Sequence, residues 1–226
     1  MHNKIKMVVF DMAGTTVNED NLVYKTLRDA ISDAGFNFSL HQVMAHGAGK
    51  EKKQAIRTIL KTFEKKQDEH MVNRIYERFI EQLTAAYATK DILPQNNAEA
   101  TFKALKQRNI LAVLNTGYDR STAQSILDKL GWKEGVQIDG LVTASDVSKN
   151  RPDPDMIHFA MHRFHILNSG EVAKIGDSTV DIEEGRNAGC GLSIGITTGA
   201  HTTEQLKTAH PDKIIDDLME LLPLLA

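Results

Sequence analysis

Short apolar runs separated by amphipathic helical patterns constrain the fold of this chain more than any other feature. The runs, rich in β-branched residues, are KMVVF (6–10), ILAVLN (110–115), GLVTAS (140–145), VAKIG (172–176) and LSIGIT (192–197). Stretches with helical spacing lie between them, at residues 98–108, 121–130, 155–164 and 181–188. This alternation predicts an α/β fold with a doubly wound, Rossmann-like parallel sheet.

One long segment interrupts the alternation. From Asp20 to Tyr87 the chain shows only amphipathic helix patterns, such as VYKTLRDAISDAG and NRIYERFIEQLTAAY. We therefore predict a helical cap domain at residues 18–91, inserted into an α/β core formed by residues 1–17 and 92–226. A cap of this kind could close over a small substrate and exclude water.

Composition argues against several classes of partner. The 226 residues carry a net charge of −3 without a cluster of basic side chains, so nucleic acid is not expected as a partner. No apolar segment is long enough to span a membrane, and the N-terminus lacks the apolar stretch of a secretory leader, so we expect a cytoplasmic protein. The single cysteine, Cys190, excludes an internal disulfide and is expected to be a small core residue.

Acidic residues mark two of the predicted strand ends. Asp11 directly follows the first strand, Asp177 follows the fourth, and Asp181 lies one helical turn later. A carboxylate at the end of a buried strand is costly to desolvate alone, so we expect Asp11 to be a metal ligand, a nucleophile or both. Three carboxylates at the carboxyl ends of the strands predict a Mg²⁺ site. The structural alternatives are a turn cap before Gly14 and a helix N-cap.

Groups that could bind an anion follow two other strands. Thr116 and Gly117 offer a hydroxyl and backbone N–H groups at a predicted helix N-terminus, although an ordinary N-cap would look the same. Arg151, immediately before Pro152, offers a cation of defined geometry. Lys149 is the alternative cation in the same loop.

The segments DMAGT, NTG, Arg-Pro and GDSTVD, in this order and at these spacings, resemble the four signatures of the haloacid dehalogenase superfamily. The resemblance spans nearly the whole chain and implies a hydrolase with an inserted helical cap. In such enzymes the residue matched by Asp11 attacks phosphorus to form an aspartyl-phosphate. The residues matched by Thr116 and Arg151 hold the transferring phosphoryl oxygens.

The same resemblance implies a metal site and a substrate-binding surface. The Mg²⁺ contacts would come from Asp11, the Ala13 carbonyl group, Asp177 and Asp181. The substrate side of the site would be lined by Gly14, Thr15, Gly117 and Tyr118.

Ala13 limits the reactions that we expect the protein to catalyse. Phosphatases of the superfamily usually carry a second aspartate at this position, which protonates the leaving alkoxide and later activates water. Because such a group contributes roughly 10²–10⁴-fold, we expect phosphate monoesters to be poor substrates. The phosphonoacetaldehyde hydrolase branch has alanine here and cleaves a C–P bond through a Schiff base on a cap lysine. The segments NTGYDR and EGRNAG, and the arginine before the proline, also resemble that branch.

The segment HGAGKEKKQ contains the candidate lysine. Lys50 follows a glycine by three residues, which is the spacing of the Schiff-base lysine in that branch. Like-charge repulsion from Lys52 and Lys53 would lower its pKa. The alternative is a solvated helix start. Met12, His46 and Lys53 depart from the residues usual in the branch, which suggests a sister group.

These observations predict a Mg²⁺-dependent, phosphonatase-like hydrolase acting on phosphonoacetaldehyde or a related small phosphonate. The alternatives are a small-molecule phosphatase of the same superfamily and a non-catalytic module that binds phosphorylated metabolites. The sequence leaves open whether the chain forms a homodimer.

Overall fold

The computed structural model describes residues 4–64 and 68–225, and it contains a six-stranded parallel sheet in the order β5-β4-β1-β6-β7-β8. The strands are β1 (Met7–Phe10), β4 (Leu111–Thr116), β5 (Gly140–Thr143), β6 (Val172–Gly176), β7 (Leu192–Ile196) and β8 (Lys213–Ile215). β1 pairs with both β4 and β6, so it lies in the middle of the sheet. The predicted α/β fold class is confirmed.

Helices cover both faces of the sheet, which explains why its strands read as continuous apolar runs. Val8 and Phe10 of β1 pack into the same cluster as Phe102, whereas Val9 packs with Met156 on the opposite face. The core helices are α5 (Ala98–Gln107), α6 (Arg120–Leu130), α7 (Asp155–Arg163), α8 (Thr179–Asn187) and α9 (Thr203–Lys207), with the 3-10 segments η1 (Ala144–Asp146), η2 (Ser169–Glu171) and η3 (Leu218–Leu225).

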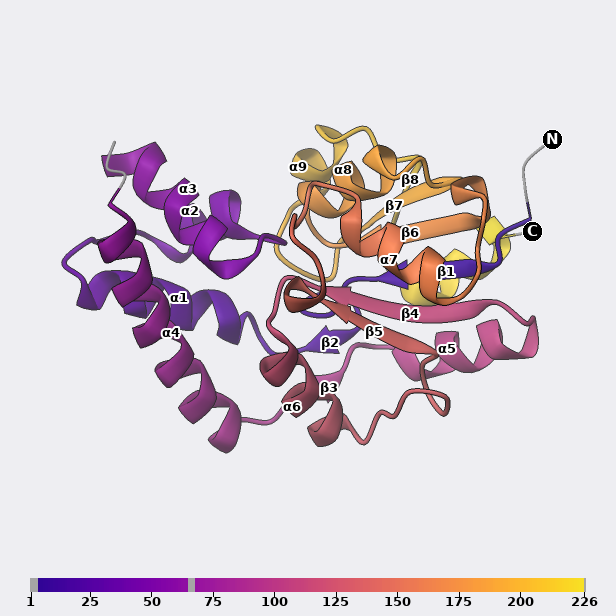
Figure 1. Cartoon of the computed structure of the whole chain (residues 1–226), viewed down its shortest axis with the longest axis horizontal. Coiled ribbons are helices and arrows are strands. Elements are labelled where there is room, and N and C mark those ends of the chain that lie inside the picture. Colours follow the sequence, from indigo (N-terminus) through magenta and orange to yellow (C-terminus); the bar gives the residue numbers. More distant parts are fainter. Residues whose placement is uncertain (1–3, 65–67, 226) are drawn as a thin grey trace.

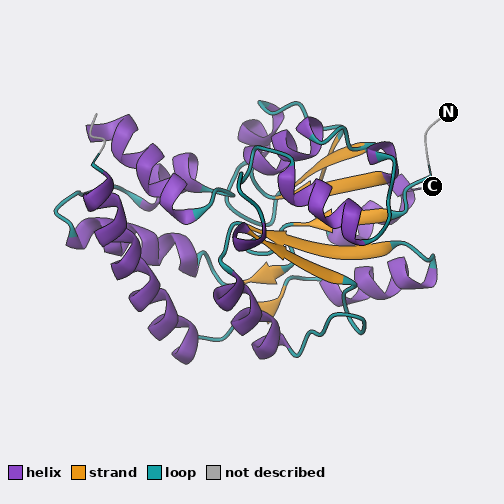
Figure 2. Ribbon diagram, viewed as in Figure 1, coloured by secondary structure: helices purple, strands orange, loops and turns teal. Residues whose placement is uncertain are grey.

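Four further helices lie beyond the carboxyl ends of the strands, at the end of the sheet to which the arrows point in Figures 1 and 2. They are α1 (Leu22–Asp33), α2 (Leu40–Gly47), α3 (Lys52–Glu64) and α4 (Glu69–Thr89). α1 packs against α2 and α4, and α3 packs against α2 and α4. This position puts the helical segment over the edge of the sheet where parallel strands present ligand sites.

A small antiparallel ribbon joins the two places where the chain passes between the sheet and these helices. β2 (Val17–Asn18) pairs with β3 (Leu93–Pro94), residue against residue. Two-residue strands leave no alternating pattern, so the sequence did not indicate them. The ribbon lies at the predicted limits 17/18 and 91/92, which stay a prediction as domain boundaries.

Two smaller observations bear on the expectations from composition. Within residues 4–64 and 68–225, no helix combines the length and the apolar character needed to cross a membrane. Cys190 packs at the edge of the core, and burial raises the pKa of its thiol to about 12. A thiol held in its neutral form fits a packing role rather than a reactive one.

Candidate active site

Asp11 lies at the middle of the sheet edge. Its N–H donates to the carbonyl oxygen of Ile175 in β6 at 2.9 Å, and its own carbonyl accepts a hydrogen bond from the Thr16 hydroxyl at 2.8 Å. These bonds fix its backbone just beyond the end of β1. Asp11 is only 5% exposed, so its carboxylate requires charged or hydrogen-bonding partners.

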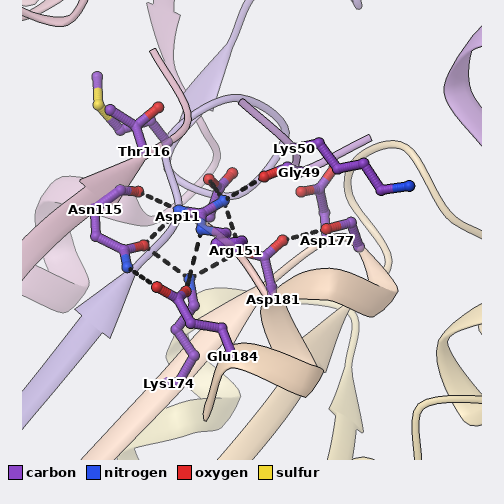
Figure 3. Close-up of polar contacts among 12 residues, drawn as sticks. Asp11, Gly49, Lys50, Asn115, Thr116, Arg151, Lys174, Asp177, Asp181 and Glu184 are labelled. Atoms are coloured by element: carbon purple, nitrogen blue, oxygen red, sulfur yellow. Dashed lines mark hydrogen bonds and ion pairs between the residues drawn. The ribbon is translucent and has the colours of Figure 1, made fainter. Parts of the chain in front are cut away.

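Arg151 is the principal partner of Asp11 (Figure 3). Its Nη1 lies 2.7 Å from Asp11 Oδ1 and 2.9 Å from Asp181 Oδ1. Its Nε lies 3.1 Å from Glu184 Oε2, and its Nη2 donates to the Asn115 carbonyl oxygen at 2.7 Å. A planar guanidinium can serve all of these groups at once, which a single ammonium group cannot do.

Three buried polar residues near Arg151 were not expected from the sequence: Asn115, Lys174 and Glu184. Lys174 Nζ lies 2.8 Å from Asp181 Oδ1 and 3.4 Å from Glu184 Oε2. The Asn115 side-chain amide donates to Glu184 Oε1 at 2.8 Å. One signal was available, because a lysine inside the apolar run VAKIG must find a buried partner.

Asp177 and Asp181 meet Asp11 at this edge. Carboxylate oxygens of the three residues lie within 4.8 Å of one another. Asp177 Oδ2 accepts the Ala200 N–H at 2.6 Å, whereas its Oδ1 is buried without a hydrogen-bond partner. Asp181 is already held by Arg151, Lys174 and the Ser178 hydroxyl. Asp177 therefore offers an oxygen that could ligate a metal ion, and Asp181 lies beside it.

We call six of these residues the buried charge cluster: Asp11, Arg151, Lys174, Asp177, Asp181 and Glu184. Its carboxylates outnumber its cations by two. Burial, together with Asp11 and Asp181, raises the pKa of Asp177. Burial and Asp181 also raise the pKa of Asp11, against the opposing effect of Arg151. An excess of buried carboxylate oxygens, one of them unpartnered, fits a hard divalent cation such as Mg²⁺.

Two glycines lie directly against Asp177. Gly14 has φ +87°, and a Cβ built there would lie 2.4 Å from Asp177 Oδ2. A Cβ at Gly199 would lie 1.9 Å from the same oxygen. Position 14 therefore requires glycine for both its backbone conformation and its contact with the carboxylate. The hydroxyl of the neighbouring Thr15 is buried without a hydrogen-bond partner.

Thr116, the last residue of β4, lies on the other side of Asp11 from Asp177 in the view of Figure 3. The Thr116 hydroxyl accepts the Tyr118 N–H at 3.2 Å. α6 begins at Arg120, and the Asp119 carboxylate accepts an N–H of its first turn at 2.9 Å. The Asp119 carboxylate therefore caps the helix N-terminus that the sequence predicted beside Gly117.

The loop between α2 and α3 contacts the buried charge cluster. The Gly49 carbonyl accepts from Arg151 Nη1 at 3.3 Å, and its N–H donates to the Tyr24 hydroxyl at 3.3 Å. Gly49 has φ +71°, and a Cβ there would lie 2.1 Å from Ser178 Oγ. This loop approaches the core too closely for any side chain at position 49.

Lys50 has its backbone at the site and its amine elsewhere. A Cβ at Gly117 would lie 2.8 Å from the Lys50 carbonyl oxygen, so the two segments pack backbone to backbone. The Lys50 Nζ donates to the His46 carbonyl at 2.9 Å, and Figure 3 shows its side chain directed away from Asp11. Burial lowers the pKa of Lys50.

A buried acid that was not expected from the sequence lies at the boundary between cap helices and core. Glu19 Oε2 accepts a 2.5 Å hydrogen bond from the Tyr87 hydroxyl, which lies 2.8 Å from the Tyr118 hydroxyl. Burial raises the pKa of Glu19 to about 7, against the effect of the Tyr87 bond. Nothing in the segment NEDN distinguishes Glu19 from a surface acid, because its phenolic partner is far away in sequence.

Comparison with known proteins agrees with this geometry. Residues 8–194 match the family described as haloacid dehalogenase-like hydrolase. The chain belongs to this family. A solved hydrolase structure from Pseudomonas syringae shares the fold, with a TM-score of 0.86 at 19% identity over 97% of each chain.

Two curated relatives bear on the type of hydrolase. A phosphonoacetaldehyde hydrolase of Latilactobacillus sakei is 26% identical, covering 98% of this chain and 95% of the relative. A probable phosphatase, IndB, of Dickeya dadantii is 25% identical, covering 96% and 91%. The protein is thus a hydrolase of the phosphatase or phosphonatase-like type, and identities at this level do not choose between the two.

The stability of the folded protein should depend on the planar shape of the Arg151 guanidinium and not only on its charge. Arg151→Lys cannot reach Asp11, Asn115 and Glu184 together, so at least one charged hydrogen bond is lost. We expect the free energy of unfolding, measured by urea denaturation, to fall by about 1.5–3 kcal/mol.

Arg120→Lys is the matched control. Arg120 also pairs with an aspartate, Asp146, but its side chain is 40% exposed. Its replacement should change the free energy of unfolding by at most about 1 kcal/mol. Equal losses in the two variants would contradict the proposed importance of the buried guanidinium.

Glu19 should make stability depend on pH. Its pKa in the folded protein, about 7, exceeds the ordinary value of 4.5, so the folded state binds more protons between these values. The stability from protonated Glu19 is full below the lower value and is lost as the pH rises through the higher one. Relative to wild type, Glu19→Gln should therefore gain about 2 kcal/mol of unfolding free energy from about pH 5 to about pH 8.

Glu77→Gln, at an exposed position of α4, serves as the control. The pH dependence that Glu77→Gln shows relative to wild type is subtracted from that of Glu19→Gln. A flat Glu19→Gln difference over the same pH range would refute the buried, proton-binding role of Glu19.

Proposed function

We propose that this hydrolase transfers the phosphoryl group of a small phosphonate aldehyde to Asp11 and then releases phosphate. The observation that carries the proposal is the combination of Asp11, held by Arg151 at 2.7 Å, with an alanine at position 13. A nucleophile without the neighbouring acid suits a carbon leaving group that leaves as an enamine. It suits an alkoxide, which needs a proton, much less.

The roles proposed for the core residues come from the motif match to the family. Asp11 is the nucleophile, and Arg151 and Thr116 hold the phosphoryl oxygens. Gly14, Thr15, Gly117 and Tyr118 line the substrate side of the site. Mg²⁺, when bound by Asp11, the Ala13 carbonyl oxygen and Asp177 with support from Asp181, would neutralise charge that develops on the phosphoryl group.

The resemblance to phosphonoacetaldehyde hydrolases also supplies the proposed electron sink. A lysine of the cap forms an imine with the aldehyde, and the motif matches this lysine to Lys50. The protonated imine then accepts the electron pair of the broken C–P bond. We propose this chemistry together with a small-molecule substrate and a cytoplasmic location.

The second candidate is a phosphatase that hydrolyses small phosphate monoesters. The similarity to a probable phosphatase over 96% of the chain supports it. It requires another group to protonate the leaving oxygen, because Ala13 cannot. The two candidates share Asp11, Arg151 and the metal site, so substrate panels separate them and active-site variants alone do not.

The wild type should release phosphate in the presence of Mg²⁺ from phosphonoacetaldehyde, and only slowly from a panel of phosphate monoesters. Asp11→Asn should reduce release by at least about 10³-fold without unfolding the protein, because the nucleophile is lost. Phosphate release, with far-ultraviolet circular dichroism as the folding check, tests both statements.

Ala13→Asp provides the opposite change. Restoring an acid two residues after the nucleophile should raise ester hydrolysis, by up to about 10²-fold, without raising cleavage of the phosphonate. Rapid ester hydrolysis by the wild type with no release from the aldehyde would reject the phosphonatase proposal in favour of the phosphatase.

A further inference from the structure

A second cap lysine is buried at the boundary with the core. Lys52, the first residue of α3, is 7% exposed. Its Nζ donates to the Lys50 carbonyl oxygen at 3.0 Å. It also lies over two aromatic rings, 5.2 Å from the centre of Tyr118 and 5.7 Å from that of Tyr24. A buried lysine with these neighbours is unusual, since lysine is almost never fully buried without a reason.

The neighbours of Lys52 are held firmly in place. The Tyr118 hydroxyl is hydrogen-bonded to Tyr87, which is hydrogen-bonded to Glu19, so the ring beside the amine has a fixed orientation. The Tyr24 hydroxyl accepts the Gly49 N–H from the loop that contacts Arg151. The amine is thus positioned by residues of the core, of α1 and of α4 together.

Lys52 is one of the residues that line a cavity of about 210 Å³. The cavity lies between cap and core, and its lining includes Lys52, Tyr76 and Phe79 from the cap helices and Gly117, Tyr118 and Ser145 from the core. The volume is below the roughly 300–1,000 Å³ typical of sites for drug-sized ligands, so it suits a leaving group of a few heavy atoms.

Lys50 has a different orientation. Its amine is bonded to the His46 carbonyl within the cap loop, and the cavity lining does not include it. What Lys50 presents toward Gly117 and Lys52 is its carbonyl group. The spacing that matches Lys50 to the family lysine fixes a position along the chain, and the side-chain direction is set by where α3 begins.

We propose that Lys52, and not Lys50, supplies the amine that contacts the leaving group of the substrate. The inference rests on the proposed function and names the lysine for it. Asp11 and Glu19 lie close enough to act electrostatically on Lys52, together with Glu51 and Arg151, so the amine belongs to the same electrostatic environment as the nucleophile.

The reaction at Lys52 begins with formation of an imine. The neutral amine adds to the aldehyde carbon, loss of water leaves an imine, and the imine nitrogen takes up a proton from water. The C–P bond breaks as the phosphoryl group passes to an Asp11 oxygen, and the bonding electron pair forms an enamine. Protonation of the enamine carbon and addition of water then release acetaldehyde and the free amine, and a second water hydrolyses the aspartyl-phosphate. Burial, which lowers the pKa of Lys52 despite the nearby acids, increases the fraction of amine able to attack.

The test traps the imine in the wild-type protein. Equimolar phosphonoacetaldehyde is added with Mg²⁺, the imine is reduced with borohydride, and the modified lysine is identified by peptide mapping. We expect the adduct on Lys52. An adduct on Lys50 would overturn the inference and leave the proposed function intact.

Lys52→Arg and Lys50→Arg form the matched pair of variants, because each keeps the positive charge and loses the ability to form an imine. Lys52→Arg should lose phosphate release from the aldehyde by at least about 10³-fold, and Lys50→Arg should retain at least about 10²-fold more activity than Lys52→Arg. The reverse pattern would also overturn the inference. Trapping in the wild type decides the matter even if Lys52→Arg does not fold.

The experiment also separates failure of the inference from failure of the proposed function. If the wild type releases phosphate only from esters, C–P cleavage is rejected, and Lys52→Met is compared with Lys50→Met on those esters. A fall of about tenfold or more in kcat/KM for Lys52→Met alone would still support contact with the leaving group. Equal effects of the two substitutions would reject it.

Discussion

The ion pair between Arg151 and Asp11 is the interaction on which the rest of this structure depends. Removing the Arg151 guanidinium would leave the four buried carboxylates of the cluster with Lys174 as their remaining cation, at a cost of about 3–5 kcal/mol. Arg151 comes from the loop after β5. It joins that loop to the end of β1 through Asp11 and to α8 through Glu184. The carbonyl of Gly49 brings the cap loop to the same guanidinium.

Because position 13 has no acid, the proposed reaction needs another group to assist the leaving group. We place that group at the boundary between cap and core. There, aromatic rings and helices exclude water from Lys52 and Glu19, and burial moves the pKa of each toward neutrality. With a pKa of about 7, the Glu19 carboxyl can exchange a proton near physiological pH, which an exposed glutamate cannot do. In the mechanism we propose, the cap contributes chemistry as well as enclosure, and the cavity of about 210 Å³ that Lys52 lines favours a small leaving group.

The sequence predicted the strands of the core because buried parallel strands leave unmistakable apolar runs, and it predicted Asp11 because an acid directly follows one of them. It did not indicate the β2–β3 ribbon, whose strands have two residues each, nor Glu19, whose partner Tyr87 is distant in the chain. The direction of the lysine side chains was equally inaccessible. Lys50 and Lys52 are two residues apart, and only the start of α3 decides which amine is enclosed.

The central claim is that Asp11 becomes covalently phosphorylated, and chemical trapping tests it most directly. Enzyme quenched in acid during turnover of phosphonoacetaldehyde is reduced with borohydride, which converts an aspartyl-phosphate to homoserine, and the peptides are sequenced by mass spectrometry. We predict homoserine at position 11 in the wild type. Sustained phosphate release with unmodified aspartate at position 11, or with homoserine at another position, would contradict the claim.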